Sequence, residues 1–483
     1  DTETIDDSNQ VDLTFAVIPG KKTYTRKILF TGNHVTQDEV LRREMRQFEG
    51  AWSSNNSIEA GKVRLERLGY FKEVNVETLP VVGTEDQIDI VYSVEEETTG
   101  SVGGNLGYSD FGLMLGFNLQ EQNFLGSGNT VGIGINKNIY SESYNISFVD
   151  PYATEDGVSL GYNIYFRETD YGEFNVANYL TNSNGLGAQF GYPISDITRL
   201  GFSLTYDKTD IDIGTLPARE IYDFVAAEGN LFETLSAQAS WQRVTLNRGL
   251  FPTSGSSTVL SLSATIPGSD LNYYRANIRQ RYYRPLSNNF VFGFQGELGY
   301  LNAYGDTEET PFFQNFYAGG PRSLRGFESN TLGPRSTDAP CYEFNYEEET
   351  CPNLIDTDGD GVLDSPYINP YANTTSRYRD RPIGGNIKIE GSLQLIFKLP
   401  IIEDQRSIRS AFFLDFGNVF SDNCRDYQIN CYKPSVDDLR YSYGVGVTWI
   451  TGFGPLSLAI AKPSNAGPQE RTEEFQFTVG NVF

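Results

Sequence analysis

Two patterns of hydrophobic and polar positions divide this chain. Up to about residue 97, strand-like runs alternate with two helical patterns, one beginning near Thr36 and one over residues 54–68. In the second helix, Ile58, Val63, Leu65 and Leu68 are expected on the buried side, and Gly69 ends it. This order predicts a compact α+β domain of roughly 75 residues.

From about Gly100 onward the helical period disappears and apolar and polar residues alternate. Tyr274, Ala276 and Ile278, for example, alternate with Arg275, Asn277 and Arg279. This alternation fits a soluble sheet with an apolar inner face, and it also fits a membrane barrel with an apolar outer face.

Strand length and connector length separate these two interpretations. The alternating runs span about nine to eleven residues, which is the reach of a tilted strand across a bilayer. Aromatic residues gather near strand ends, and short connectors alternate with long ones. At about 24 residues per strand and connector, residues 98–483 give about sixteen antiparallel strands. We therefore predict a membrane β-barrel preceded by the α+β domain.

Composition excludes several functions. No apolar run approaches about 18 residues, so no transmembrane helix is expected. A net charge of −26 argues against nucleic acid as a partner. The single histidine, His34, disfavours Ser-His or Cys-His catalysis, and there is no phosphate-binding loop. The chain is expected to be no enzyme and to require no cofactor.

The four cysteines form two close pairs in polar segments. Their spacings fit neither a zinc site nor a thioredoxin motif. Two local disulfides in an oxidising compartment are expected, Cys341 with Cys351 and Cys424 with Cys431.

An acidic run, DTDGDGVLD at 356–364, resembles the first half of a calcium-binding loop. Tyr367 stands where an EF-hand needs its glutamate, which excludes an EF-hand. Two readings stay open, an acidic turn in solution or a partial calcium loop using Asp356, Asp358, Asp360 and Asp364.

A long irregular segment, about 306–384, begins soon after the strand pattern at 290–300 ends. Near its start lies GGPRSLRGF, Gly319–Phe327, in which glycines flank two arginines. Glycine at these positions indicates tight turns that deliver an arginine to a specific place.

Several motifs together resemble one known family. LRREMRQFEGAW at 41–52 and RLGYF at 67–71 are similar to a POTRA domain. The barrel half adds NFLGSGN at 123–129, GLFPTS at 249–254, TIPGSDL at 265–271, NFYAGG at 315–320 and then LRGF, with leucine in place of the usual valine. The order of these motifs is that of the BamA family of bacterial outer-membrane protein insertases, within the POTRA-plus-barrel superfamily.

The resemblance implies a domain plan. Residues 1–20 would end a penultimate POTRA domain, residues 21–97 would be the last one, and residues 98–483 would be the barrel. The long extracellular loop would fold into the barrel, and its tip would carry Leu324, Arg325, Gly326 and Phe327.

The resemblance also implies that Arg325 meets acidic groups on the lumen wall. Asp415 alternates with Phe412, Leu414 and Phe416, so it points inward if they face lipid. Gln394 stands where the family has a second acidic partner, so it brings a hydrogen-bonding group without charge. The alternative is that Arg325 is an ordinary solvated arginine of a loop.

Glycines in the first strand and near the chain end suggest a weak seam. The first strand carries Gly103, Gly104 and Gly107, and the last carries Phe477, Gly480 and the terminal Phe483. Glycine weakens a ladder, and by resemblance these strands form a lateral gate that templates incoming strands. Alternatively, the glycines only ease curvature or packing.

The implied function is insertion of unfolded barrel proteins into the outer membrane, with the POTRA domain in the periplasm. Accessory periplasmic lipoproteins would dock near a helix expected around Glu44–Trp52. The main alternative is a two-partner-secretion-type polypeptide transporter, which has the same domain plan. A surface adhesin or calcium-stiffened receptor and a diffusion porin are less well supported, the first by the acidic loop alone.

Overall fold

The structure, a computed structural model, describes residues 2–4, 11–13, 22–109, 112–154, 156–174, 176–177, 179–213, 218–337, 381–399, 407–426, 428, 431–452 and 454–480. The chain divides into two compact units, residues 1–100 with 121–130, and residues 101–120 with 131–483. Within the described ranges, no helix has both the length and the apolar character that crossing a membrane requires.

Unit 1 contains a small α+β domain. Its sheet has the order β3-β5-β4, with β3 (Tyr24–Thr31) parallel to β5 (Gln87–Glu96) and β4 (Phe71–Pro80) antiparallel to β5. Helices α1 (Asp38–Arg42) and α2 (Asn55–Leu68) complete the domain, and Gly69 ends α2 in the left-handed region at φ 71°. Before this domain, β1 (Thr2–Thr4) and β2 (Val11–Leu13) form a separate antiparallel pair.

Two details of this domain differ from expectation. Val63 is not on the buried side of α2 but 39% exposed; the buried positions are Ile58, Gly61 and Leu65. Gly61 is required there because a Cβ would come within 2.9 Å of Tyr92 Oη. The helix expected over 44–52 is absent, since α1 ends at Arg42.

A side chain holds residues 44–54 in turns in place of that helix. The amide of Gln47 donates to the Trp52 carbonyl at 3.0 Å, and its oxygen accepts from the Ser54 N–H at 3.0 Å. These bonds replace helical ones and lead the chain into α2.

The end of β5 also organises the turn before α1. The carboxylate of Glu96 accepts backbone N–H groups from His34 at 3.0 Å, Val35 at 3.0 Å and Thr36 at 2.6 Å. Burial acts to raise the pKa of Glu96, but the hydrogen bonds from Thr36, Val35 and His34 outweigh it and hold the pKa below its ordinary value.

Unit 1 further includes the turn at 121–130. Asn123 donates from Nδ2 to Thr36 Oγ1 at 2.8 Å, and Tyr70 donates from its hydroxyl to the Gly128 carbonyl at 3.2 Å. Leu125, Gly126 and Gly128 all have positive φ, which explains the two glycines of the NFLGSGN motif.

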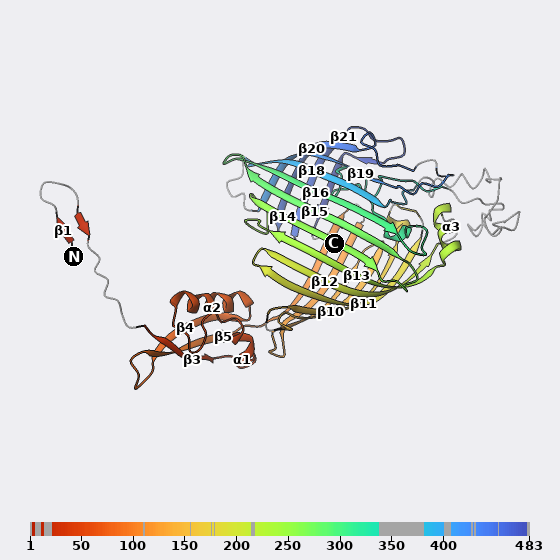
Figure 1. Cartoon of the computed structure of the whole chain (residues 1–483). Coiled ribbons are helices and arrows are strands. Elements are labelled where there is room, and N and C mark those ends of the chain that lie inside the picture. The colour runs from red at the N-terminus through yellow and green to blue at the C-terminus, as the bar shows by residue number, and fades with distance from the viewer. Residues whose placement is uncertain are drawn as a thin grey trace. The chain divides into compact units, whose positions relative to one another are not determined.

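Sixteen strands of the described chain close into an antiparallel barrel (Figure 1). They are β6 (Gly100–Ser109), β7 (Gly112–Phe124), β8 (Asn129–Lys137), β9 (Ser141–Asp150), β10 (Ser159–Asp170), β11 (Leu180–Ser195), β12 (Thr198–Asp212), β13 (Leu231–Val244), β14 (Gly255–Thr265), β15 (Tyr273–Pro285), β16 (Phe290–Ala303), β18 (Ile387–Phe397), β19 (Ile408–Phe420), β20 (Arg440–Thr451), β21 (Gly454–Pro463) and β23 (Phe475–Val479). The predicted barrel of about sixteen strands is confirmed.

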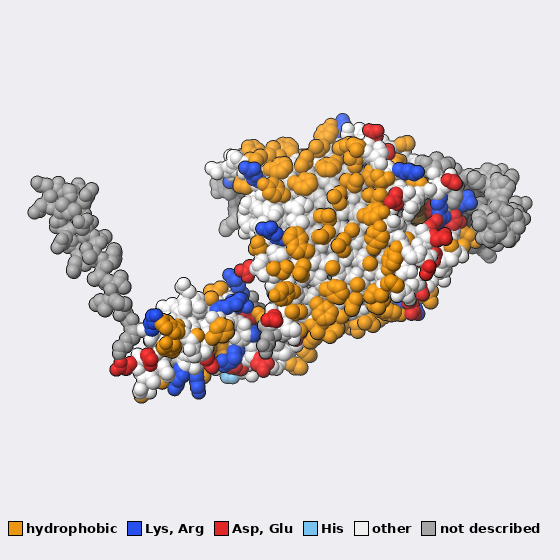
Figure 2. Space-filling model, viewed as in Figure 1, with side chains coloured by type: hydrophobic (Ala, Val, Ile, Leu, Met, Phe, Trp, Pro, Cys, Tyr) orange, Lys and Arg blue, Asp and Glu red, His pale blue; other side chains and the backbone are white. Residues whose placement is uncertain are grey.

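The two faces of each strand differ as a membrane barrel requires. On β19, Phe412 is 54% and Leu414 41% exposed, whereas Phe413 and Asp415, which alternate with them, are buried. Figure 2 shows hydrophobic side chains spread over the outer face of the barrel, with charged side chains gathered toward its ends. An apolar outer face and a polar inner face fit a barrel set in a bilayer.

Shorter elements occupy the connections. They are η1 (Tyr171–Phe174), α3 (Arg219–Glu228), η2 (Phe312–Gln314), β17 (Gly326–Phe327) and β22 (Thr472–Glu473). Helix α3 packs Ile221 and Phe224 against Phe232 and Phe312, so the connection between β12 and β13 shares a hydrophobic core with the long loop after β16.

Candidate functional site

The tip of the long loop is built around tight glycine turns. Gly319, Gly320 and Gly326 have φ of 107°, 99° and 89°. A Cβ at Gly319 would lie 2.4 Å from the Glu328 carbonyl oxygen, and one at Gly326 would lie 3.1 Å from Ala461 Cβ. Any other residue at these positions would therefore be strained or in contact with its neighbours.

Two side chains of the LRGF motif hold the tip by burial. Leu324 and Phe327 are both 0% exposed and share a cluster with Leu301, Phe316, Ala318, Leu332 and Val419. Burying a leucine and a phenylalanine stabilises the tip by roughly 1.5–3 kcal/mol each. Between them, Arg325 is directed to the wall of the barrel.

Arg325 meets Asp415 of β19, as the resemblance implies, and Asp415 faces inward as the alternation pattern predicts. Its Nε lies 2.7 Å from Asp415 Oδ2 and its Nη2 lies 2.7 Å from Oδ1, a two-pronged pair. The backbone N–H of Arg325 also donates to Oδ2 at 3.2 Å. Asp415 is fully buried and the Arg325 side chain is 16% exposed, so the pair is largely removed from water. Such a pair is costly to break from one side.

The residue of β18 that contacts Arg325 is not the one expected from the sequence. The direct partner on β18 is Ser392, whose hydroxyl accepts from Arg325 Nη2 at 3.1 Å. Gln394 donates to that same hydroxyl at 3.2 Å, so it touches Arg325 through Ser392. The register explains this, because Ser392 stands opposite Asp415 and Gln394 stands opposite Phe413.

Phe413 is a partner that the sequence interpretation missed. The guanidinium carbon of Arg325 lies 3.4 Å from the centre of the Phe413 ring, and Phe413 is 4% exposed. A cation over an aromatic face adds about 0.5–2 kcal/mol. The signal that could have revealed it is its place two residues before Asp415, which puts both side chains on the lumen face.

The seam between the last and first strands is the second part of the candidate site. Among the described residues, β23 and β6 share one ladder pair, Val479 with Tyr108, whereas β20 and β21 share ten. Across the seam Tyr108 stacks on Phe477 with ring centres 5.5 Å apart. The closure is therefore weak compared with the other ladders.

The predicted gate glycines have different surroundings. At Gly480, φ is 79° and a Cβ would lie 2.2 Å from the Leu106 carbonyl oxygen, so this glycine permits close approach across the seam. At Gly103 a Cβ would lie 2.5 Å from the Asn118 amide oxygen, which is a packing role. Gly104 has open space within 4 Å, and Gly107 is buried beside Gly480. Phe483 lies outside the described residues.

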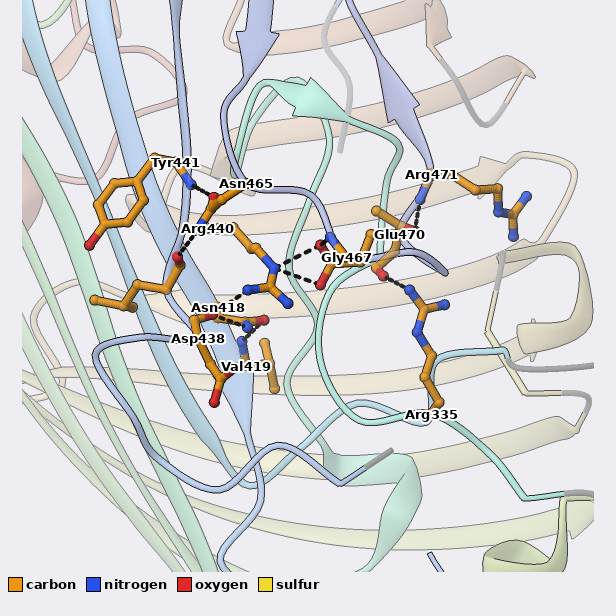
Figure 3. A network of polar contacts seen from close by, with 12 residues as sticks. Arg335, Asn418, Val419, Asp438, Arg440, Tyr441, Asn465, Gly467, Glu470 and Arg471 are labelled. Carbon is orange, nitrogen blue, oxygen red and sulfur yellow. Dashed lines mark hydrogen bonds and ion pairs between the residues drawn. The ribbon is translucent and has the colours of Figure 1, made fainter. Parts of the chain in front are cut away.

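A buried ion pair organises the loops that precede the last strand (Figure 3). Arg440, at the start of β20, donates from Nε to both oxygens of Glu470 at 2.8 and 2.7 Å. Glu470 also accepts the Gly467 N–H at 2.6 Å, and Asn465 binds the backbone on both sides of Arg440. These contacts fix the turn between β21 and β22.

Only some of the remaining predicted site residues lie in the described part of the chain. Cys424 and Cys431 form a disulfide, as expected, with their Cα atoms 5.7 Å apart. Cys341, Cys351 and the aspartates Asp356, Asp358, Asp360 and Asp364 lie outside the described residues. Within the described part of the chain, no three His, Cys, Asp or Glu side chains are grouped to hold a metal ion.

The chain matches known proteins along nearly all of its length. Residues 123–483 match the Omp85 superfamily domain, and residues 23–97 match the POTRA repeat, described as a surface antigen variable number repeat. It is 31% identical to the outer membrane protein assembly factor BamA of Neisseria meningitidis serogroup B, across 99% of this chain and 59% of that protein. The chain thus spans about three-fifths of the length of that curated relative.

Solved structures agree with the sequence matches. The crystal structure of BamA from Haemophilus ducreyi lacking POTRA domains 1–3 aligns with a TM-score of 0.81 at 31% identity, covering all of this chain and 88% of that one. CdiB from Escherichia coli aligns with a TM-score of 0.57 at 12% identity, covering 95% of this chain and 76% of that one, a likeness of fold alone. The chain belongs to the Omp85 superfamily, with a POTRA domain ahead of an outer-membrane β-barrel.

Proposed function

We propose that this protein folds and inserts β-barrel proteins into the outer membrane through the seam between β6 and β23. The observation that carries the proposal is the single ladder pair at that seam among the described residues, whereas β21 and β23 share five pairs and β20 and β21 share ten. Similarity to BamA assembly factors supports the same conclusion.

The mechanism follows from unpaired strand edges. A strand edge presents a row of N–H and C=O groups that pair readily with another extended chain. Among the described residues, separating β6 from β23 breaks one ladder pair and one aromatic stack, and it exposes two such edges at once. An unfolded strand pairs with an edge and leaves its apolar face toward lipid, so no covalent chemistry is needed.

The periplasmic domain offers a surface for accessory proteins. In the turns at 44–52, Phe48 is 71% and Trp52 50% exposed. Trp52 packs edge-on against Tyr24 at 5.6 Å, and Lys22 lies 3.5 Å from its ring centre. Exposed aromatic residues are enriched at protein–protein interfaces. We place the docking of periplasmic lipoproteins here, on turns rather than on the helix expected from the sequence.

The second candidate, transport of a polypeptide through the lumen, is less well supported. The tip of the long loop is tied to the wall by the buried pair of Arg325 and Asp415. Beside it lies a cavity of about 430 Å³, lined by Arg322, Gln394, Arg409 and Gln476 among others. A translocating chain would have to displace the tip and break that pair.

Locking the seam tests the proposal. Tyr108→Cys with Val479→Cys places cysteines on the paired residues of β6 and β23. The chain is reconstituted in liposomes with an unfolded barrel substrate, and insertion is scored by protease protection of the substrate. We expect the oxidised variant to lose insertion on the order of tenfold or more and to regain it on reduction.

A matched lock elsewhere serves as the control. Ala237→Cys with Ala264→Cys joins β13 and β14, which are also paired directly. This variant should insert substrate normally when oxidised, and the unmodified chain with reductant controls for Cys424–Cys431. Full insertion by the locked seam would overturn the proposal. Passage of a secreted polypeptide into the liposome lumen would favour the transporter.

A further inference from the structure

Gln476 joins the last strand of the barrel to the tip of the long loop. It lies on β23 and is 2% exposed. Its Oε1 accepts from the Gly326 N–H at 3.2 Å, and its Nε2 donates to the Phe327 carbonyl at 2.7 Å. One side-chain amide thus satisfies a backbone donor and a backbone acceptor of the LRGF motif.

The residues just before β23 continue this connection. β17 pairs with β22 through Gly326 with Glu473 and Phe327 with Thr472. Further along, the Glu328 N–H donates to the Arg471 carbonyl at 3.0 Å, and the Arg471 N–H donates to Thr331 Oγ1 at 2.9 Å. The loop from 326 to 331 is therefore hydrogen-bonded to the chain from 471 to 476, directly ahead of the seam.

The opposite side of the tip is held by a different part of the wall. Arg325 pairs with Asp415 on β19 and Ser392 on β18, and these strands share a ladder of eleven residue pairs. The tip thus spans from this well-paired wall to β23, for which the described residues give one ladder pair with β6. Movement of β23 away from β6 must either stretch the Gln476 contacts or carry the tip with it.

We propose that Gln476 couples the seam to the loop, so that the docked tip holds β23 in the closed position. If β23 moves without the tip, the buried Gly326 N–H loses its bond to Gln476, and the Phe327 carbonyl keeps only the bond from the Gly320 N–H at 3.0 Å, which is unfavourable. The coupling is reciprocal: opening the seam loosens the tip, and releasing the tip from Asp415 loosens the seam. This inference rests on the proposed lateral seam, but it concerns what keeps that seam shut.

The test measures seam closure and loop docking directly and needs no insertion assay. Gln476→Leu removes both of these hydrogen bonds at similar volume, together with the longer one from Nε2 to Glu473 at 3.4 Å. Gln476→Glu removes only the donations from Nε2, to Phe327 and to Glu473. Seam closure is followed as the rate of disulfide formation between cysteines introduced at Tyr108 and Val479. Loop docking is followed by hydrogen exchange at 324–332, and heat-modifiable gel mobility confirms a folded barrel.

We expect Gln476→Leu to slow disulfide formation and to raise hydrogen exchange at the tip, each roughly tenfold, the equivalent of about 1.4 kcal/mol. Gln476→Glu should give the same direction, which keeps the test decisive if the leucine variant folds poorly. Thr478→Val is the matched control: it is the next lumen-side residue of β23 and makes no described side-chain hydrogen bond. It should change neither measurement.

The reciprocal variant completes the design. Arg325→Met releases the tip from Asp415 on β19, a strand that does not form the seam, and should also slow disulfide formation between residues 108 and 479. If the Gln476 variants alter the tip but leave the seam unchanged, or if Arg325→Met leaves the seam unchanged, the coupling is refuted. That result would leave the locked-seam insertion experiment, and hence the proposed function, unaffected.

Discussion

Removing the charge of Asp415 should release the tip of the long loop. Asp415→Asn keeps the shape of the side chain and one acceptor oxygen, but it leaves Arg325 facing a neutral partner. Asp415 accepts three hydrogen bonds from Arg325, at 2.7, 2.7 and 3.2 Å, and it is fully buried. The substitution therefore removes the charge and one acceptor oxygen while it keeps the shape of the side chain.

The magnitude follows from what remains around Arg325. Breaking a buried ion pair from one side costs about 3–5 kcal/mol. Ser392 and the Phe413 ring still hold the guanidinium, and the adjoining cavity of about 430 Å³ has room for water. We expect a net loss of about 2–3 kcal/mol in docking, which is roughly a 30- to 150-fold rise in the undocked population.

Hydrogen exchange at residues 319–332, in a barrel held in lipid nanodiscs, measures this population. A double-mutant cycle with Arg325→Met isolates the pairwise coupling. Gln394→Leu is the control, because it lies at the same cavity but reaches Arg325 through Ser392, and it should cost under about 0.5 kcal/mol. A coupling below about 0.5 kcal/mol, or a control as severe as Asp415→Asn, would refute this reasoning. Arg325→Ala should likewise loosen the loop and lower insertion.

Three further substitutions or titrations test other parts of the structure. Glu96→Gln should destabilise the turn at 34–36 by about 1 kcal/mol. Because folding lowers the pKa of Glu96 from 4.5, the stability difference from wild type should be full above about pH 4.5 and should shrink as the pH falls further. Hydrogen exchange of the His34, Val35 and Thr36 amides measures this difference. Gly480→Ala should push β23 from the Leu106 carbonyl and slow disulfide trapping of residues 108 and 479 about fivefold, whereas Gly104→Ala, which meets open space, should not. If residues 356–364 bind calcium, calorimetric titration should give saturable heat below about millimolar calcium, and Asp358→Asn with Asp360→Asn should abolish that heat. The absence of heat at millimolar calcium would exclude a calcium site there.

Much of the fold follows from periodicity, because a barrel strand must alternate between lipid and lumen. That rule alone places Asp415 inward, on the face opposite to the exposed Phe412 and Leu414. It cannot give register, since a shift of a strand by two residues preserves the alternation. The resemblance points to Gln394 as the partner of Arg325 on the preceding strand, whereas the ladder places Ser392 opposite Asp415.

The errors in the N-terminal domain have a different origin. The helical period shows which residues share a face only when each position is placed around the helix. Val63 then lies far around the helix from Ile58 and Leu65, on a different face. Residues 44–52 carry helix-forming side chains, yet the amide of Gln47 and the pairing of buried Glu44 with Arg64 at 2.7 Å fix a turn instead. Such tertiary contacts override local propensity and cannot be found in a single sequence.

The charge balance at the loop tip bears on how the seam is held. Arg325 faces one carboxylate, since its partner on β18 is the neutral hydroxyl of Ser392. The docked tip is therefore a neutral pair, and its release separates one positive and one negative charge. By contrast, parting β23 from β6 breaks, among the described residues, one ladder pair and one aromatic stack, worth roughly 1–2 kcal/mol together. Because Gln476 joins the tip to β23, the resting state of the seam depends on the docked loop as well as on the seam's own pairing.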